Sequence, residues 1–203
     1  MGLPLRDSRH HTYGDYLHWP EDVRYELIDG EAYLMAPAPT ATHQRLVGEL
    51  FRQIADALED RDCEVFIAPF DVRLPRADEE DEAIDTVVQP DLTVVCDPGK
   101  IDERGCRGAP DWVIEVLSPS TAAHDQTRKL AAYERAGVRE CWLVHPGDRT
   151  VMVYTIADEA IASRAYGRPA ISELVGTLDS SAVDGVRVDW SRVLRERAAG
   201  SGD

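Results

Sequence analysis

Ionisable side chains occur between residues 90 and 133 at positions where an ordinary protein core has none. Asp91 stands at the start of the apolar run 92–96, and Glu115 lies inside a second apolar run, 112–117. Runs of this kind are typical of strands that are buried on both faces. Because an isolated carboxylate in such a strand is strongly destabilising, it must be protonated, paired with a cation or bound to a metal.

A helix is predicted after the second run, and Lys129 lies on its apolar face. At about 100° per residue, that face is formed by Leu130, Tyr133 and Ala136. Lys129 falls within the same face, and Asp125 lies at its edge. Since the apolar face of a helix packs against the sheet, we expect the Lys129 ammonium to point at the two strands.

Two carboxylates on neighbouring strands and a lysine directed at them suit the metal-aided hydrolysis of a phosphodiester. Carboxylate oxygens are ligands for Mg²⁺ or Mn²⁺, and the ammonium could position the attacking water or offset charge on the phosphate. The same residues could instead form a buried ion-pair network, with an Asp125–Lys129 pair along the helix. The spacing alone leaves both interpretations open.

Short motifs around these residues follow one another in a recognisable order. They are Pro90 with Asp91, Glu115 within 113–120, then Asp125, Lys129 and Tyr133, and Gly137 with Val138 before the apolar run 141–144, preceded by 25–31 and by His43 with Gln44. This order resembles the Uma-type restriction endonuclease family, a branch of the PD-(D/E)XK nuclease superfamily. The resemblance covers roughly residues 12 to 190.

The resemblance implies a hydrolase that cleaves DNA, with Asp91 and Glu115 holding Mg²⁺ or Mn²⁺ and Lys129 as the catalytic lysine. Leu117 stands where the superfamily pattern has its lysine, two residues after Glu115. The family is thought to supply the lysine from the following helix, and Lys129 fits that place. Asp125 and Tyr133 are supporting candidates.

His43 is a further supporting candidate, from a helix predicted over residues 40–59. It lies on the apolar stripe of that helix near its start, so it either approaches the site or is a satisfied buried histidine. Glu49 falls on the opposite side and is expected to face solvent.

The predicted fold is α/β, a restriction-endonuclease-like mixed β-sheet flanked by helices. At 203 residues and 43% hydrophobic content, the chain suits one domain, 1–203. We expect a nuclease-like core over about 40–146, an N-terminal hairpin over 24–36 that turns at Asp29 and Gly30, and C-terminal strands and a helix over 150–198. Residues 64–74 are predicted to form one strand, with Pro69 at a bulge or edge. The strand over 141–144 is expected to pair in parallel with the Glu115 strand.

The net charge of −16 argues against tight binding to DNA, because Lys and Arg normally neutralise the phosphates. The acidic run 78–82 and Asp85 are expected in a solvated, mobile loop. Lys100, Arg104 and Arg107 form the basic cluster closest in sequence to the site, and they either contact phosphates or are solvated loop charges. DNA is therefore expected to bind weakly.

The four cysteines form no CxxC pair, so neither a zinc site nor a disulfide is expected. The absence of a run of about 18 apolar residues, and of a signal peptide's apolar centre, predicts a cytoplasmic protein without membrane contact. A homodimer is expected from the exposed strand edges of such a sheet.

Two functions are compatible with the sequence. One is a metal-dependent endonuclease, favoured by Lys129 on an inward helix face. The other is a non-catalytic binding or assembly module that keeps the nuclease fold, favoured by Leu117 and the acidic composition.

Overall fold

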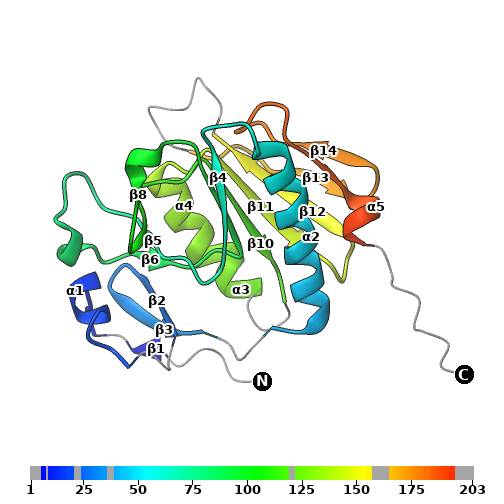
Figure 1. Cartoon of the computed structure of the whole chain (residues 1–203). Coiled ribbons are helices and arrows are strands. Elements are labelled where there is room, and N and C mark those ends of the chain that lie inside the picture. The colour runs from blue at the N-terminus through cyan, green and yellow to red at the C-terminus, as the bar shows by residue number, and fades with distance from the viewer. Residues whose placement is uncertain are drawn as a thin grey trace, which may run out of the picture.

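A computed structural model gives the fold of the chain (Figure 1). The structure describes residues 6–7, 9–20, 24–35, 39–118, 122–156 and 165–194.

A six-stranded sheet carries most of the predicted core strands. Its order is β13 (Ala170–Glu173), β12 (Thr150–Thr155), β11 (Glu140–His145), β10 (Trp112–Val116), β7 (Leu92–Val95) and β4 (Glu64–Ile67). β10 and β11 pair in parallel, as predicted, and the other neighbours are antiparallel. The mixed sheet confirms the predicted fold class.

Helices cover both faces of this sheet. In one cluster, Leu50 and Ile54 of α2 (Ala41–Leu58) pack with Trp112 of β10. In a second cluster, Tyr133 of α4 (Leu130–Ala136) packs with Val113, the next residue of β10. Because successive strand residues point to opposite faces, α2 and α4 lie on opposite sides of the sheet, as Figure 1 shows. Within the described ranges, no helix has the length and apolar character needed to cross a membrane.

The predicted hairpin belongs to a second, seven-stranded sheet. Its strands are, in order, β1 (Arg6–Asp7), β3 (Glu31–Leu34), β2 (Tyr25–Ile28), β6 (Val87–Val88), β5 (Val72–Arg73), β9 (Gly105–Arg107) and β8 (Ile101–Asp102). Asp29 and Gly30 both have positive φ, 53° and 78°, which confirms the predicted two-residue turn. The short helix α1 (Tyr13–Tyr16) packs its buried Tyr13 with Leu27 of this hairpin.

The prediction of a single strand over residues 64–74 is wrong. The chain forms β4, leaves the six-stranded sheet at a cis Ala68–Pro69 bond, and enters the other sheet as β5. Proline cannot donate a ladder hydrogen bond, so a break at Pro69 is reasonable. The change of sheet depends on contacts distant in sequence.

The C-terminal strands and helix are anchored by a buried carboxylate. The predicted helix begins at Trp190 (α5, Trp190–Val193), after the pair β14 (Thr177–Asp179) and β15 (Arg187–Asp189), and its expected continuation to 198 lies outside the described residues. Glu140 is fully buried and accepts hydrogen bonds from the backbone N–H groups of Ser181 and Ala182, both at 2.7 Å. Glu140 thereby ties the loop between β14 and β15 to the six-stranded sheet.

The expectation of four free cysteines is wrong, because Cys63 and Cys96 form a disulfide. In the β4–β7 ladder Glu64 pairs with Val95, so the next pair outward is Cys63 with Cys96. The bond thus depends on a strand register that spacing in the sequence does not reveal. Cys106 and Cys141 are free and buried.

Thiol counting tests this pairing. After unfolding without a reductant, we expect two cysteines, Cys106 and Cys141, to react with N-ethylmaleimide. A reductant should raise the count to four, and Cys63→Ala should expose Cys96 as a third reactive thiol without one. Four labelled cysteines in the unreduced, unfolded protein would contradict the disulfide.

Candidate active site

Asp91 and Glu115 meet at one end of the ladder between β7 and β10. Ile114 pairs with Leu92 in antiparallel register, so the next pair in the same register is Glu115 with Asp91. Directly opposed residues of an antiparallel pair lie on the same face. The Asp91 carboxylate also accepts a 2.8 Å hydrogen bond from the backbone N–H of Val116. The prediction that the Asp91 and Glu115 strands are neighbours is confirmed.

The Lys129 ammonium lies between two buried carboxylates. Its Nζ is 2.7 Å from Oε1 of Glu115 and 2.9 Å from Oε1 of Glu26. All three residues are less than 5% exposed. Lys129 therefore points at the sheet, as the helical pattern predicted.

The backbone around Lys129 is a π-helical turn, η3 (Asp125–Lys129), which follows α3 (Ala122–His124) and leads into α4. A π turn is wider than an α turn and is frequently found at functional sites. Asp125 and Lys129 are both buried in it, with Asp125 Oδ1 3.8 Å from Nζ. The regular spacing of about 100° per residue assumed for the prediction therefore does not hold across this turn, although Lys129 still reaches the site.

Tyr133 also reaches the site. Its hydroxyl donates a 2.5 Å hydrogen bond to Oε1 of Glu115, the oxygen that faces Lys129. Burial, and then the charges of Glu115 and Glu26, raise the pKa of Tyr133 well above its usual value. The phenol is thus a hydrogen-bond donor across the whole working range of pH.

His43 lies beside Asp91, so of the two predicted positions, near the site or buried away from it, the first is the one observed. Thr40 caps α2, accepting from the His43 backbone N–H, and the His43 Nε2 lies 3.2 Å from Oδ2 of Asp91. The hydrogen bond to Asp91 raises the pKa of His43, although burial opposes the shift. Its Nδ1 is buried and has no hydrogen-bond partner among the described residues.

Glu26 is the site residue that the sequence interpretation missed. It lies on β2 and accepts a 2.9 Å hydrogen bond from the backbone N–H of Gln89, and the His124 Nε2 lies 3.4 Å from its other oxygen. The available signal was the one used for Glu115, a carboxylate within an apolar strand, here 25–28. That strand was interpreted as part of a peripheral hairpin, which hid its relation to the site.

The three central groups differ in their preferred protonation. Burial would raise the pKa of Glu26, but the Lys129 ammonium, the nearby His124 imidazole and the hydrogen bond from the Gln89 backbone N–H lower it to about 2. Burial, with the nearby charges of Asp125, Asp91 and Glu26, raises the pKa of Glu115 well above 4.5 despite Lys129. Burial would lower the pKa of Lys129, but Glu115 and Glu26 raise it well above 10.5. One ammonium is therefore too little positive charge for this set of carboxylates.

The deficit of positive charge fits a hard divalent cation. The described residues contain no group of three or more His, Cys, Asp or Glu side chains arranged to hold a metal. Mg²⁺ does not require one, because it usually keeps several waters and binds through one or two carboxylates. Asp91 and Glu115 supply such a pair.

The basic cluster predicted near the site is engaged within the protein. Lys100 donates to the carbonyl of Ala109, and Arg107 donates to the carbonyl of Glu79. Arg104 and Arg107 also lie 3.7 Å and 3.4 Å from the Asp81 carboxylate. These side chains are therefore already occupied by neighbouring acceptors.

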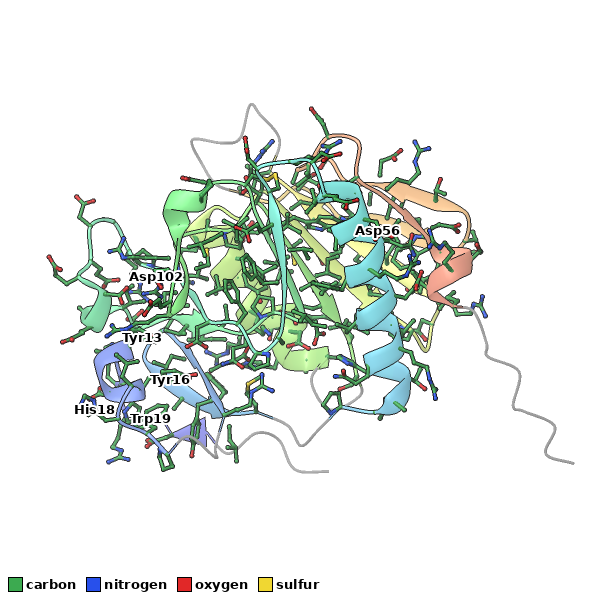
Figure 2. All side chains as sticks on the ribbon, in the orientation of Figure 1. Tyr13, Tyr16, His18, Trp19, Asp56 and Asp102 are labelled. Carbon is green, nitrogen blue, oxygen red and sulfur yellow. A yellow bond between two sulfur atoms is a disulfide. The ribbon has the colours of Figure 1, made fainter. Side chains whose placement is uncertain are left out.

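Part of the acidic run has a structural role, so its description as a solvated loop is wrong for two residues. Asp81, in the short helix η1 (Asp81–Ala83), pairs with the buried Arg73. Arg73 also pairs with Asp102, which is labelled in Figure 2. Asp85 is buried and hydrogen-bonds Thr86. Because Arg73 is buried, its charge needs Asp81 and Asp102 as partners.

Glu49, expected to face solvent, is partly covered by its ion pair with Arg52 and does not take part in the site.

Comparison with known proteins agrees with the resemblance noted in the sequence. The profile of the Uma2 family, described as "Putative restriction endonuclease", matches residues 13–186. A crystal structure of "a putative nuclease belonging to DUF820" from Anabaena variabilis has a TM-score of 0.68 and 21% identity, and the match covers 90% of this chain and 96% of that one. That identity supports likeness of fold alone.

Two Synechocystis proteins show similarity in sequence. Uncharacterized protein slr1290 is 31% identical over 121 residues, and uncharacterized protein sll1609 is 31% identical over 126 residues. The matches span 59% and 60% of this chain, and 60% and 67% of the two relatives.

A pair of isosteric substitutions tests the charge assignment, measured as urea unfolding in EDTA at pH 7. Glu26→Gln removes a carboxylate that is ionised and paired, so it should lower the free energy of unfolding by about 3 kcal/mol. Glu115→Gln removes a carboxyl group whose ionised form is disfavoured. The free energy of unfolding should therefore fall by less than about 1 kcal/mol, or rise.

The pH dependence of stability separates the two residues further. The stabilisation from Glu26 is complete above its unfolded pKa of 4.5 and is lost as the pH falls toward 2. Glu115 has a raised pKa, so the parent should lose stability as the pH rises from 4.5 toward that value, and Glu115→Gln should lack this slope. A larger loss of stability in Glu115→Gln than in Glu26→Gln at pH 7 would contradict the assignment.

Proposed function

Because the chain belongs to the Uma2 family, we propose that it is a metal-dependent endonuclease that hydrolyses phosphodiester bonds of DNA. The observation that carries the proposal is the meeting of Asp91, Glu115 and Lys129 at one end of the β7–β10 ladder. A carboxylate pair can hold a catalytic metal ion, and a neighbouring ammonium can stabilise charge that develops on a phosphate.

In this proposal Asp91 and Glu115 hold Mg²⁺, for which Mn²⁺ could substitute. When bound, the cation supplies a polarised water and charge stabilisation at the phosphate. Asp91 is oriented for this role by the N–H of Val116 and by His43, which fix the same oxygen, Oδ2. The raised pKa of Glu115 indicates a carboxylate that would gain from an added cation.

Lys129 is the proposed catalytic lysine, and it positions water or offsets charge on the phosphate. Tyr133 and Asp125 act as positioning residues, since Tyr133 fixes the Glu115 carboxylate and Asp125 lies beside the ammonium. His43 can hold a proton next to Asp91, because its pKa is raised. Glu26 joins this set as the second anchor of Lys129.

The proposed setting rests on the amino-acid sequence. We propose a single domain over 1–203 that acts as a homodimer in the cytoplasm, where both DNA and Mg²⁺ are present. Contact with DNA should be weak and should depend on salt concentration, given the net charge of −16. The Cys63–Cys96 disulfide argues against this location, because disulfides are rare in cytosolic proteins.

A non-catalytic module with a nuclease fold is the second candidate, and one observation favours it. Lys129 makes short contacts with both Glu115 and Glu26, so the three residues also make sense as a buried ion-pair network between two sheets. The two candidates differ in metal binding and in the effect of removing Lys129.

Titration calorimetry with Mn²⁺ tests the metal site. The parent should bind Mn²⁺, and Asp91→Asn should weaken binding at least about tenfold because one carboxylate ligand is lost. Asp111→Asn is the matched control, since Asp111 accepts a 2.8 Å hydrogen bond from the N–H of Cys96 at the opposite end of the same ladder. Binding that is absent, or equal in both variants, would support the module.

Plasmid nicking tests Lys129. In Mg²⁺, Lys129→Met should lower the nicking rate by about a hundredfold or more, through loss of charge stabilisation in the transition state. Arg128→Met, at the exposed neighbouring position of the same turn, should nick at the parental rate.

Loss of stability must be separated from loss of catalysis in this experiment. Lys129→Met alone leaves Glu26 as an unpaired buried charge, so the double variant Glu26→Gln with Lys129→Met should recover most of the stability and none of the nicking. A double variant that nicks like Glu26→Gln alone would show that Lys129 is a structural partner.

A further inference from the structure

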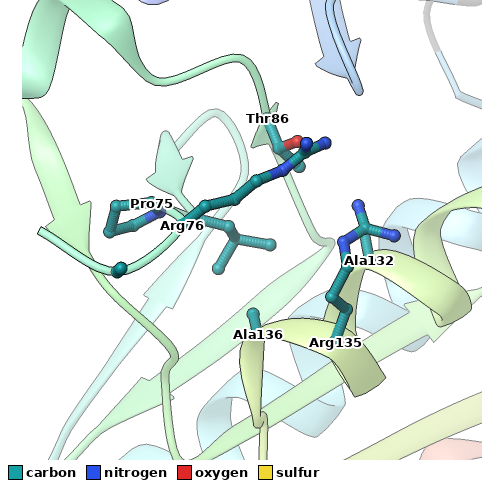
Figure 3. Close-up of a pocket in the computed structure, with 8 residues that line it drawn as sticks. Pro75, Arg76, Thr86, Ala132, Arg135 and Ala136 are labelled. Carbon is teal, nitrogen blue, oxygen red and sulfur yellow. The ribbon is translucent and has the colours of Figure 1, made fainter. Parts of the chain in front are cut away.

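A cavity of about 280 Å³ lies against α4, and none of Asp91, Glu115, Glu26 and Lys129 lines it. Its walls include Leu74, Pro75, Ala132 and Ala136, which make it largely apolar. Arg76 and Arg135 also line it, and Figure 3 shows their guanidinium groups turned toward one another.

The two arginines share one carboxylate oxygen. Oδ1 of Asp29, at the hairpin turn, lies 2.7 Å from Nη2 of Arg76 and 2.6 Å from Nη2 of Arg135. Two more acids lie near Arg76: Oδ1 of Asp85 is 3.5 Å from its Nη2, and the Glu79 carboxylate accepts a 2.8 Å hydrogen bond from its backbone N–H. The side chains of the two arginines and of Asp29 are between 43% and 51% exposed.

We propose that this cavity binds a phosphate monoester carried on a small planar group, that is, a mononucleotide or the terminal nucleotide of a strand. The phosphate takes the position that the Asp29 carboxylate occupies between the two guanidinium groups. The planar group lies on the apolar wall formed by Leu74, Pro75 and the two alanines of α4.

The geometry favours a phosphate for two reasons. Arginine donors match phosphate oxygens, and two of them already converge on a single anionic oxygen. Ion pairs this exposed contribute little to stability, so displacing Asp29 costs little. The two-arginine arrangement is not needed to neutralise one exposed carboxylate.

The size and lining of the cavity favour a nucleotide over a free inorganic ion. A volume of 280 Å³ is close to the lower end, roughly 300 Å³, of ordinary small-molecule sites. An inorganic phosphate would leave the apolar wall uncovered, whereas a base would bury it.

The proposal is independent of the proposed nuclease activity. Binding here uses no metal and none of Asp91, Glu115 and Lys129, so it is measured in EDTA, where no cleavage occurs. Failure of the nicking experiment would leave this inference untouched.

The experiment compares dAMP, a short single strand with a 5′-phosphate, the same strand without it, and inorganic phosphate, by calorimetry. Arg76→Gln and Arg135→Gln should each weaken dAMP binding roughly tenfold, because each removes a charged hydrogen-bond donor. Asp29→Asn should tighten it roughly tenfold by removing the competing carboxylate, and asparagine tolerates the positive φ of 53°. Arg187→Gln, from a similarly exposed pair with Asp179, is the control and should bind as the parent does.

The probes identify the source of the nucleotide. Tighter binding of dAMP indicates a free mononucleotide, and tighter binding of the phosphorylated strand indicates a strand end. The unphosphorylated strand and inorganic phosphate should bind about tenfold more weakly than the better of the two. Binding of dAMP that is undetectable in Asp29→Asn, or equal in the parent and Arg135→Gln, would overturn the proposal and leave Asp29 as a clamp between the hairpin and α4. Equal affinity for inorganic phosphate and dAMP would overturn the assignment to a nucleotide.

Discussion

The buried ammonium of Lys129 is the interaction on which the arrangement of the molecule depends. It contacts Glu115 from the six-stranded sheet and Glu26 from the seven-stranded sheet. A buried charge is tolerated only when its partners are in place. The two sheets must therefore dock for the lysine to be accommodated, and the same docking assembles the site. The N-terminal hairpin is therefore part of the candidate site, through Glu26 on β2.

The site combines rigid support with an unbalanced charge. Asp91 is held by a strand N–H and by His43, and Glu115 is held by Tyr133 and Lys129. Such support preorganises a functional group, because its own rotamer is fixed before a ligand arrives. Acidic side chains outnumber the single ammonium in this set, and burial together with the neighbouring carboxylates raises the pKa of Glu115.

The local features of the chain were predictable from the sequence, and the features that depend on contacts between sheets were not. Helix α2, the Asp29–Gly30 turn and the inward aim of Lys129 follow from short-range periodicity and turn chemistry. Glu26 was missed because its neighbour Lys129 is more than 100 residues away in sequence. The Cys63–Cys96 bond was missed because it requires the register of β4 on β7. The π turn was missed because regular helical spacing was assumed across it.

The π turn at Asp125–Lys129 carries one residue more than a regular helical turn. Its hydrogen bonds run from residue i to i+5 where those of an α-helix run from i to i+4, so a single turn accommodates the extra residue. Removing one residue between Asp125 and Lys129 would restore regular winding and leave the orientation of α4 nearly unchanged, with Tyr133 still beside Glu115. Only the spacing between Asp125 and Lys129 would shorten. The turn therefore allows a change in chain length to be absorbed locally, without rotating the helix that carries Tyr133.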